Sequence, residues 1–381
     1  MLGSKKWAQN LLSLVDIKID GERAWDIQIR DERFYGSVAH RGSLGLGESY
    51  MNGWWDAQEL DQFFFKVFGA NLESKVRFSW PAVSSFIEGF LLNLQTRSHA
   101  FDIGEKHYDV GNDLYKAMLG KSLTYTCGYW PASPTSGQGG KDVKNLDEAQ
   151  EAKLNLVCRK IGLKPGDSVL DIGCGWGSFL KFAAEKYGAH GLGVTVSKEQ
   201  VNLAKELCGE LPVEIRLEDY RNIKGKFDHV VSLGMFEHVG RKNYRDYMEI
   251  VHNVLKDGGL FLLHTIGSSR SLVDTDPWIQ KYIFPNSMLP SIAQIGKSIE
   301  GLFVMEDWHN FGADYDKTLM AWWGNFNRAW PELSKSYSDR FYRMWKYYLM
   351  TSAASFRSRR IQLWQIVLSK NGVRSGYIPV R

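Results

Sequence analysis

The 381-residue chain lacks any apolar run near the length of a membrane span. Its first residues, Met1 to Trp7, lead directly into an amphipathic pattern and lack the apolar segment and cleavage site of a signal peptide. The four cysteines, Cys127, Cys158, Cys174 and Cys208, have no CxxC spacing, which indicates neither a zinc site nor a disulfide framework. We therefore expect a cytoplasmic protein that binds no metal.

The chain also lacks a strong excess of charge of either sign. A formal net charge of +4 permits attraction to anionic membranes or nucleic acid but implies neither. The 44% hydrophobic and 24% charged composition is that of a globular protein, long enough for two or three domains. Aromatic residues are plentiful, with 14 Trp, 17 Tyr and 20 Phe. We expect most of them in a core; the alternative is a lipid-facing surface or a pocket that holds a cation against ring faces.

The first 94 residues predict a small mixed domain of helices and short strands. We expect helices at residues 4–15, 60–68 and 81–94, strands at 17–19 and 25–29, and a glycine-broken stretch at 42–50. Residues 95–102 are expected to form a linker. Residues 103–381 then form the catalytic domain, with helical insertions at about 270–300 and 315–358.

From Asn145 onward the pattern alternates strands and helices. Asn145 with Glu148 predicts a capped helix start, and Ser197 to Gln200 reads as a capping box for another helix. The expected strands are residues 168–172, 190–196, 213–217, 227–233 and 260–265, followed by 303–309 and 361–368. This alternation predicts an α/β domain built on a parallel sheet with right-handed crossovers.

A glycine-rich turn, Asp171-Ile-Gly-Cys-Gly-Trp-Gly177, follows the first of these strands. Gly173, Gly175 and Gly177 let the backbone pass close to a ligand, as nucleotide-binding turns between a strand and a helix do. The second strand ends in Thr195 instead of the acidic residue that a nicotinamide dinucleotide site needs. The pattern therefore favours S-adenosylmethionine.

Further candidate groups lie at or beyond the later strands. Asp219 is a candidate acceptor for the adenine amino group, or a carboxylate in a surface turn. Glu237 and His238 follow the strand at 227–233, and His264 lies on the next one; a carboxylate and an imidazole at adjacent strand ends suit acid–base work. A buried core histidine is the competing interpretation of His264. Cys127 lacks a neighbouring base and is expected to be a small packed residue.

Several motifs together resemble the cyclopropane fatty acid synthases, in the branch that acts on bacterial phospholipids. The resemblance extends over nearly the whole chain, including residues 42–55. The segments that carry it are Glu105–Asp113, Tyr125–Trp130, Leu170–Gly177, Gly234–Gly240, His264–Gly267, Tyr282–Pro285 and Phe311–Asp316.

The resemblance implies a class I S-adenosylmethionine-dependent methyltransferase fold, Rossmann-like, with a mostly parallel seven-stranded sheet. Members of the family add a methylene from S-adenosylmethionine across a cis double bond of a phospholipid acyl chain. The resulting carbocation is deprotonated by a bound bicarbonate. By matching motifs, the bicarbonate ligands are backbone groups of Cys127 and Ile266 and the side chains of Glu237, His264 and Tyr315.

The same resemblance implies the methyl-donor contacts and a membrane partner. The contacts are Tyr125, Thr126, Gly173, Gly175, Thr195 and Gln200, with Asp219 and Tyr220 near the adenine. Where well-known members carry a C-terminal cysteine, this chain has Ser352, so a thiolate there cannot be required. A protein of this kind docks on the inner face of a phospholipid membrane, and the resemblance also allows a homodimer. The candidate docking elements are residues 4–15, 54–55, 340–346 and 357–360, each of which ordinary core packing also explains.

Two alternatives stay open at this point. The protein could keep the methyl donor but make a methyl or methylene branch instead of a ring, or it could be a lipid-binding protein on a methyltransferase scaffold. Nucleic-acid methylation is disfavoured because the basic residues are scattered and no Asn/Asp-Pro-Pro-aromatic motif ends the strand at 227–233.

Overall fold

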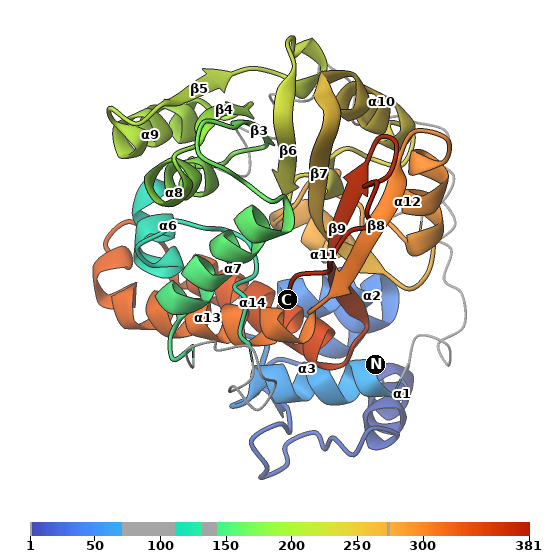
Figure 1. The fold of residues 1–381 in the computed structure, drawn as a ribbon. Coiled ribbons are helices and arrows are strands. Elements are labelled where there is room, and N and C mark those ends of the chain that lie inside the picture. The colour runs from blue at the N-terminus through green and yellow to red at the C-terminus, as the bar shows by residue number, and fades with distance from the viewer. Residues whose placement is uncertain (1, 71–110, 132–142, 273–274) are drawn as a thin grey trace. The chain divides into compact units, whose positions relative to one another are not determined.

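The computed structural model describes residues 2–70, 111–131, 143–272 and 275–381 (Figure 1). Its contacts divide the chain into two compact units. The first, here called the helical unit, comprises Met1–Leu92, Val273–Pro285 and Leu319–Ile361. The second, the sheet unit, comprises Asn93–Leu272, Asn286–Thr318 and Gln362–Arg381. Within the described ranges, no helix is both long and apolar enough to cross a membrane.

The sheet unit is built on seven strands in the order β5-β4-β3-β6-β7-β9-β8. The pairs β3–β4, β4–β5, β3–β6 and β6–β7 are parallel, whereas β8–β9 is antiparallel. The predicted α/β fold with a mostly parallel seven-stranded sheet is therefore confirmed. The strands are β3 (Ser168–Ile172), β4 (His190–Thr195), β5 (Val213–Leu217), β6 (Phe227–Leu233), β7 (Leu255–Ser268), β8 (Val304–Asn310) and β9 (Ile361–Ser369).

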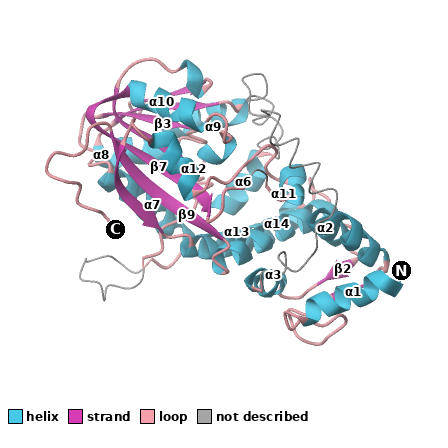
Figure 2. Ribbon diagram, turned by 90° about the vertical axis from the view of Figure 1, so that its right-hand side faces the viewer, coloured by secondary structure: helices cyan, strands magenta, loops and turns pink. Residues whose placement is uncertain are grey.

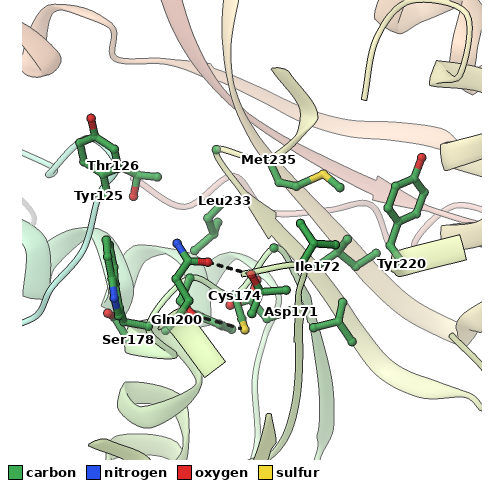
Figure 3. Close-up of a pocket in the computed structure, with 18 of the residues that line it drawn as sticks. Tyr125, Thr126, Asp171, Ile172, Cys174, Ser178, Gln200, Tyr220, Leu233 and Met235 are labelled. Carbon is green, nitrogen blue, oxygen red and sulfur yellow. Dashed lines mark hydrogen bonds between the residues drawn. The ribbon is translucent and has the colours of Figure 1, made fainter. Parts of the chain in front are cut away.

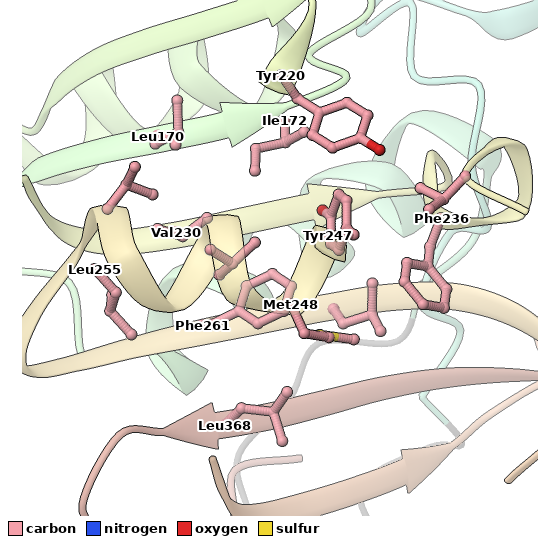
Figure 4. Packing of buried hydrophobic residues seen from close by; sticks show 14 of the residues in the cluster. Leu170, Ile172, Tyr220, Val230, Phe236, Tyr247, Met248, Leu255, Phe261 and Leu368 are labelled. Carbon is pink, nitrogen blue, oxygen red and sulfur yellow. The ribbon is translucent and has the colours of Figure 1, made fainter. Parts of the chain in front are cut away.

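Helices cover both faces of this sheet (Figures 1 and 2). Neighbouring strand residues alternate between two buried apolar clusters, because side chains in a strand point to opposite faces. Val169 and Val231 belong to the cluster with α7 (Leu146–Lys160), α8 (Ser178–Tyr187) and α9 (Lys198–Cys208). Leu170 and Val230 belong to the other cluster, in which α10 (Tyr244–Val254) and α12 (Ile292–Ile299) pack (Figure 4). Each fully buried aliphatic side chain stabilises the fold by about 1.5–3 kcal/mol.

Local capping fixes where two of these helices begin. The Asn145 side chain accepts a hydrogen bond from the backbone N–H of Glu148 at 3.0 Å, as predicted. The Ser197 hydroxyl likewise accepts from the N–H of Gln200 at 3.3 Å. The predicted capping box is only half formed, however, because the Gln200 Oε1 atom accepts from the Thr195 hydroxyl at 2.7 Å and Ser197 N–H donates to Thr195. This diversion ties α9 to the end of β4.

The helical unit consists of helices and one short two-stranded sheet. Helix α13 (Ala313–Leu333) contributes residues to both units, and α6 (Asn112–Leu119) belongs to the sheet unit. The other elements are α1 (Leu2–Ser13), α2 (Arg33–Met51), α3 (Leu60–Gly69), α11 (Pro277–Tyr282), α14 (Asp339–Arg357) and the antiparallel pair β1 (Gln28–Ile29) and β2 (Trp55–Asp56).

Of two predictions for the first 70 residues, one is confirmed in part and the other is wrong. The stretch at 42–50, expected to be broken by its glycines, is interrupted at Gly42, where φ is 54°, and is helical through its other glycines within α2. The strand expected at 25–29 shrinks to two residues, and residues 17–19 contribute a single bridge between Ile19 and Ile27. Burial of Tyr50 and Met51 on α2 overrides the low helix propensity of glycine.

The core of the helical unit is a cluster of aromatic rings around Trp55, which is fully buried. Its ring centroid lies 5.2 Å from those of both Tyr50 and Phe63. The Arg343 guanidinium donates to the carbonyl oxygens of Tyr50 at 2.6 Å and Trp55 at 2.8 Å, and to the Asp56 carboxylate at 3.0 Å. The sequence makes Trp55 and Arg343 candidates for membrane docking, but both side chains are part of this core.

The predicted domain boundary near residue 94, the linker at 95–102 and the helix at 81–94 lie outside the described residues, so the division into domains stays a prediction. Helices α11 and α14 were expected to be insertions of the catalytic domain, but their contacts place them with α2 and α3 in the helical unit.

Candidate active site

A pocket in the sheet unit opens at the carboxyl ends of β3, β4, β5 and β6. It lies where the strand order reverses around β3, the usual binding place in doubly wound sheets. In Figure 3, Tyr125 and Thr126 lie on one side of this pocket and Tyr220 on the opposite side. The predicted methyl-donor residues that line it are Tyr125, Thr126, Asp171, Gly173, Gly175, Thr195, Gln200, Asp219 and Tyr220.

The glycine turn after β3 has the conformation that its composition suggests. Gly173 has a φ of 83°, and a Cβ there would lie 2.6 Å from the Met235 Cβ. Gly175 has a φ of 55° and faces open space. Gly177 does not line the pocket; it is the left-handed residue before the first turn of α8, and its predicted ligand contact stays a prediction. The turn thus exposes backbone to the pocket where a side chain would not fit.

The polar residues at the ends of β4 and β5 that are predicted to contact the methyl donor already form hydrogen bonds within the protein. Thr195 donates to Gln200 Oε1, which leaves the Gln200 amide nitrogen as the group available to a ligand (Figure 3). Asp219 is buried and accepts from both the backbone N–H and the Nε of Arg221, each at 2.9 Å. Asp219 is therefore not the carboxylate of an exposed turn, and a carboxylate retains room for a further donor.

The segment Tyr125–Trp130 is held against the pocket from two sides. From α7, Gln150 Nε2 donates to the Thr126 carbonyl oxygen and Lys153 Nζ donates to the Thr126 hydroxyl, both at 2.8 Å. From α13, the Thr318 hydroxyl accepts from the Gly128 N–H at 3.1 Å and Asp314 accepts from the Trp130 N–H at 2.8 Å. These bonds fix the backbone beside the predicted donor contact Thr126.

Lys153 is a pocket residue that the sequence interpretation missed. Its side chain is fully buried and lines the pocket with Asp171, whose Oδ1 has no hydrogen-bond partner among the described residues. Burial lowers the pKa of Lys153 and raises the pKa of Asp171, while the lysine charge opposes the latter shift. In the sequence, the sign of this pocket residue is that Lys153 and Gln150 are polar residues three positions apart on the otherwise apolar face of the helix at 146–160.

Glu237 lies in a buried turn directly after β6. Its Oε1 accepts from the backbone N–H of Ile266 at 2.6 Å, and its Oε2 has no partner within the described part of the chain. Burial raises the pKa of Glu237 to about 7, against the opposing effect of the Ile266 N–H. A carboxyl group with such a pKa can gain or lose a proton near neutral pH.

His264 lies on β7, opposite Leu233 of β6, and is buried. Its Nδ1 lies 3.3 Å from the Gln365 Nε2 atom on β9, and its Nε2 is without a partner among the residues described. Burial, followed by the charges of Lys153 and Lys160, holds the pKa of His264 well below its usual range. The imidazole is therefore neutral, and it is not a histidine with all its polar atoms satisfied by the core.

None of the remaining predicted catalytic residues lines the pocket; Cys127 and Tyr315 are buried, and Ile266 is partly exposed. Cys127 donates its thiol proton to the Gly128 carbonyl at 3.0 Å, and burial raises its pKa well above the usual range, which disfavours a nucleophilic thiolate. Tyr315 is 8% exposed near the start of α13. The Ile266 N–H is directed at Glu237, so Ile266 orients that carboxyl group. His238 does line the pocket, and burial lowers its pKa to about 4.

Residues 95–366 match the family model described as mycolic acid cyclopropane synthetase, which covers more than half of the chain. The chain belongs to this family. It is 50% identical, over 97% of its length and 94% of the relative's, to the cyclopropane-fatty-acyl-phospholipid synthase of Escherichia coli K12. It is also 35% identical, over 69% of its length and 68% of the relative's, to a probable fatty acid methyltransferase of Pseudomonas putida.

A solved structure extends the likeness to three dimensions. The mycolic acid cyclopropane synthase CmaA1, in complex with SAH and CTAB, superposes with a TM-score of 0.63 at 29% identity, covering 71% of this chain and 98% of that one. The predicted family, the methyltransferase fold and the assignment to an enzyme of this family are thereby confirmed. The roles of individual site residues stay predictions.

Proposed function

We propose that this protein transfers a methylene group from S-adenosylmethionine to the cis double bond of an unsaturated phospholipid acyl chain and closes a cyclopropane ring. The observation that carries the proposal is a pair of buried polar atoms without partners among the described residues, Glu237 Oε2 in the turn after β6 and His264 Nε2 on β7 opposite the last residue of β6. Burying such atoms without partners costs about 1–3 kcal/mol each, a cost that a binding role explains. The likeness to the Escherichia coli phospholipid enzyme supplies the substrate class.

The pocket residues suit the methyl donor. In this proposal the backbone of Gly173 and Gly175 and the side chain of Gln200, all lining the pocket, bind the aminoacyl part. Asp219 and Tyr220, which also line it, bind the adenine. An alkene is a weak nucleophile, so rate depends on holding the sulfonium methyl carbon in line with the double bond. The hydrogen bonds of Gln150 and Lys153 to Thr126 keep that wall of the pocket in place.

The buried groups also fit a bicarbonate ion. Glu237 presents an unpartnered carboxylate oxygen that accepts a hydrogen bond, and His264 presents an imidazole nitrogen. Tyr315 and the Cys127 backbone complete the proposed ligand set, with Ile266 holding Glu237 in place. Bicarbonate, when bound there, supplies a base beside the acyl chain.

The reaction then balances without any redox partner. The alkene π electrons form a bond to the sulfonium methyl carbon, the C–S bond breaks, and S-adenosylhomocysteine leaves. The carbocation left on the chain loses a proton from the new methyl group, and the freed electron pair forms the second C–C bond of the ring. Glu237, whose pKa of about 7 lies near physiological pH, accepts the proton that leaves the site.

Membrane access is proposed to be peripheral, on the cytoplasmic face. Among the sequence candidates, Trp55, Arg343 and Arg357 are already engaged inside the helical unit, Arg357 through Asp61 at 2.7 Å. Helix α1 keeps Trp7 36% exposed and is a candidate with an apolar ring at the surface. A homodimer remains a prediction without a structural argument.

A fatty-acyl methyltransferase that stops at a branch is the second candidate, favoured by the similarity to the Pseudomonas putida relative. Mass spectrometry of cis-unsaturated phospholipid vesicles, incubated with the protein and S-adenosylmethionine, separates the two. A gain of one methylene with loss of the alkene supports the synthase. A gain with the alkene retained supports a methylene branch. No gain despite donor binding contradicts both and points to another acceptor, and failure to bind the donor leaves a lipid-binding protein.

A further inference from the structure

Gln365 is a buried polar residue that neither the sequence motifs nor the proposed reaction uses. It lies on β9, two strand residues beyond Leu363, and is fully buried. Its amide nitrogen lies 3.3 Å from the Nδ1 atom of His264 on the neighbouring strand β7. Its Oε1 has no partner in the described part of the chain. Burying an amide with an unsatisfied oxygen costs folding free energy, and a functional role of the hydrogen bond to His264 would explain that cost.

The chemistry of a neutral imidazole gives that bond a consequence. One ring nitrogen carries the proton and the other accepts, and the hydrogen bond made by one nitrogen decides the state of the other. When Gln365 Nε2 donates to Nδ1, the proton must be on Nε2. Nε2 is the atom left unpartnered, so it becomes a hydrogen-bond donor. An anion such as bicarbonate needs a donor at that place, whereas the other tautomer would present a lone pair and repel it.

The surroundings hold the ring in one orientation. The Phe311 ring packs edge-on against the imidazole with centroids 5.9 Å apart. The backbone carbonyl of His264 accepts from the Gly234 N–H at 2.9 Å, which anchors the strand position. Burial keeps the imidazole neutral, and the charges of Lys153 and Lys160 act in the same direction. The tautomer is therefore set by the Gln365 contact and not by protonation of both nitrogens.

We infer that Gln365 is a positioning residue that fixes His264 in the Nε2–H tautomer, so that its imidazole donates to the anion bound beside Glu237. The inference rests on the proposed function for the identity of the anion. The tautomer itself is a property of the protein without substrate, and it can be measured without any turnover.

The test uses the full-length protein labelled with ¹⁵N-histidine. The His264 signals are assigned by their loss in His264→Ala, and the nitrogen shifts report which ring nitrogen is protonated. The wild type is expected in the Nε2–H form. Gln365→Glu places a carboxylate acceptor at Nδ1 and should move the proton to Nδ1. Gln365→Met keeps the length of the side chain without the donor and should give a mixture of tautomers.

Gln362→Met is the matched control. Gln362 lies on the same strand but accepts from the Asn310 side chain at 2.6 Å and the Trp364 indole at 3.1 Å, so the His264 tautomer should not change. In the same samples, Gln365→Met should lower turnover about tenfold or more and raise the half-saturating bicarbonate concentration. The dissociation constant for S-adenosylmethionine should stay within about twofold, because Gln365 does not line that pocket.

The outcomes separate this inference from the proposed function. An Nδ1–H tautomer in the wild type, or an unchanged tautomer in both Gln365 variants, would overturn the positioning role. A changed tautomer with raised bicarbonate requirement supports both. A changed tautomer with no effect of bicarbonate on any variant supports the role of Gln365 and contradicts the anion site. Thermal unfolding and circular dichroism establish that each variant is folded before it is scored.

Discussion

The two units of the chain differ in whether some of their buried ionisable groups keep a polar atom without a partner. In the helical unit, Arg343 bonds to Asp56 and two carbonyl oxygens, and Arg357 bonds to Asp61. In the sheet unit, Asp171, Glu237 and His264 each keep one buried polar atom without a partner among the described residues. Satisfied groups stabilise a fold, whereas unsatisfied ones reduce stability and persist where a ligand completes them. The difference separates the part of the molecule built for stability from the part built for chemistry.

The largest expected effect is that of Glu237→Gln. The change keeps the shape and removes the acid–base function, so turnover should fall about 10³-fold while the affinity for S-adenosylmethionine stays nearly constant. Steady-state kinetics with calorimetric donor binding measures both. Glu249→Gln, on the exposed pair with Arg245, is the control and should behave as wild type. An equal loss of donor affinity would reassign Glu237 to the donor pocket.

His264→Ala should reduce turnover about 10²-fold by removing a hydrogen-bond donor to the anion. Added bicarbonate should restore part of the rate, because the anion site is weakened and not abolished. His252→Ala, on α10 outside the site, controls for loss of an imidazole elsewhere. If bicarbonate had no effect on the variant at any concentration, the assignment of His264 to an anion site would fail.

Arg343→Met tests a charged group of the helical unit that is hydrogen-bonded within the protein. Loss of its charged hydrogen bonds should lower the free energy of unfolding by about 2 kcal/mol. Arg340→Met is the matched control, since Arg340 makes a single bond to Asn52 at 3.2 Å and is exposed, and it should cost less than about 0.5 kcal/mol. Donor affinity should change in neither variant. A large drop in donor affinity for Arg343→Met would contradict the assignment of stability to these helical-unit contacts and of donor binding to the sheet unit.

The pH dependence of stability should show the proton on Glu237. Its pKa is raised from 4.5 to about 7 in the folded protein, so between these values the folded state binds more protons than the unfolded state. Stability must then fall as pH rises through this window, by at most about 1.4 kcal/mol per pH unit from this group. Glu237→Gln should make this fall of stability less steep in urea unfolding at pH 5, 6 and 7, while Asp171, whose pKa is also raised to about 7, keeps its own contribution. An identical slope in both proteins would show that the folded-state pKa is unshifted.

Of the three site variants Glu237→Gln, His264→Ala and Lys153→Met, the last is expected to have the smallest effect on function. Removing the ammonium group from the pocket frees Thr126 and leaves Asp171 without its cation, so the dissociation constant for the donor should rise about tenfold. Stability should also fall, because removing one partner of a buried charged pair leaves the other, Asp171, uncompensated. Lys160→Met, a buried lysine on the same helix outside the pocket, should leave donor affinity unaltered. Equal loss in both variants would point to a helix defect.

Much of the sheet unit could be predicted from the sequence because its signals are local. β3, β5 and β6 have the predicted bounds, and the glycine turn follows β3 as expected. In the stretch at 42–50 the expected break occurs at Gly42, whereas the other glycines are helical because tertiary burial in α2 outweighs their low helix propensity. Lys153 left only the signal of a polar side chain on an apolar helix face, and Gln365 is a polar residue within an apolar strand. The partner of each, Thr126 or His264, lies more than 20 residues away. Their roles follow only from tertiary neighbours.

The most direct test of the central claim is turnover of the wild-type protein on cis-unsaturated phospholipid vesicles in buffer freed of carbon dioxide, with bicarbonate added back stepwise. The account predicts a low rate that rises and saturates with bicarbonate while donor binding is constant throughout. A rate that is high without bicarbonate and unaffected by its addition would contradict the claim that Glu237 Oε2 and His264 Nε2 are left open for an anion.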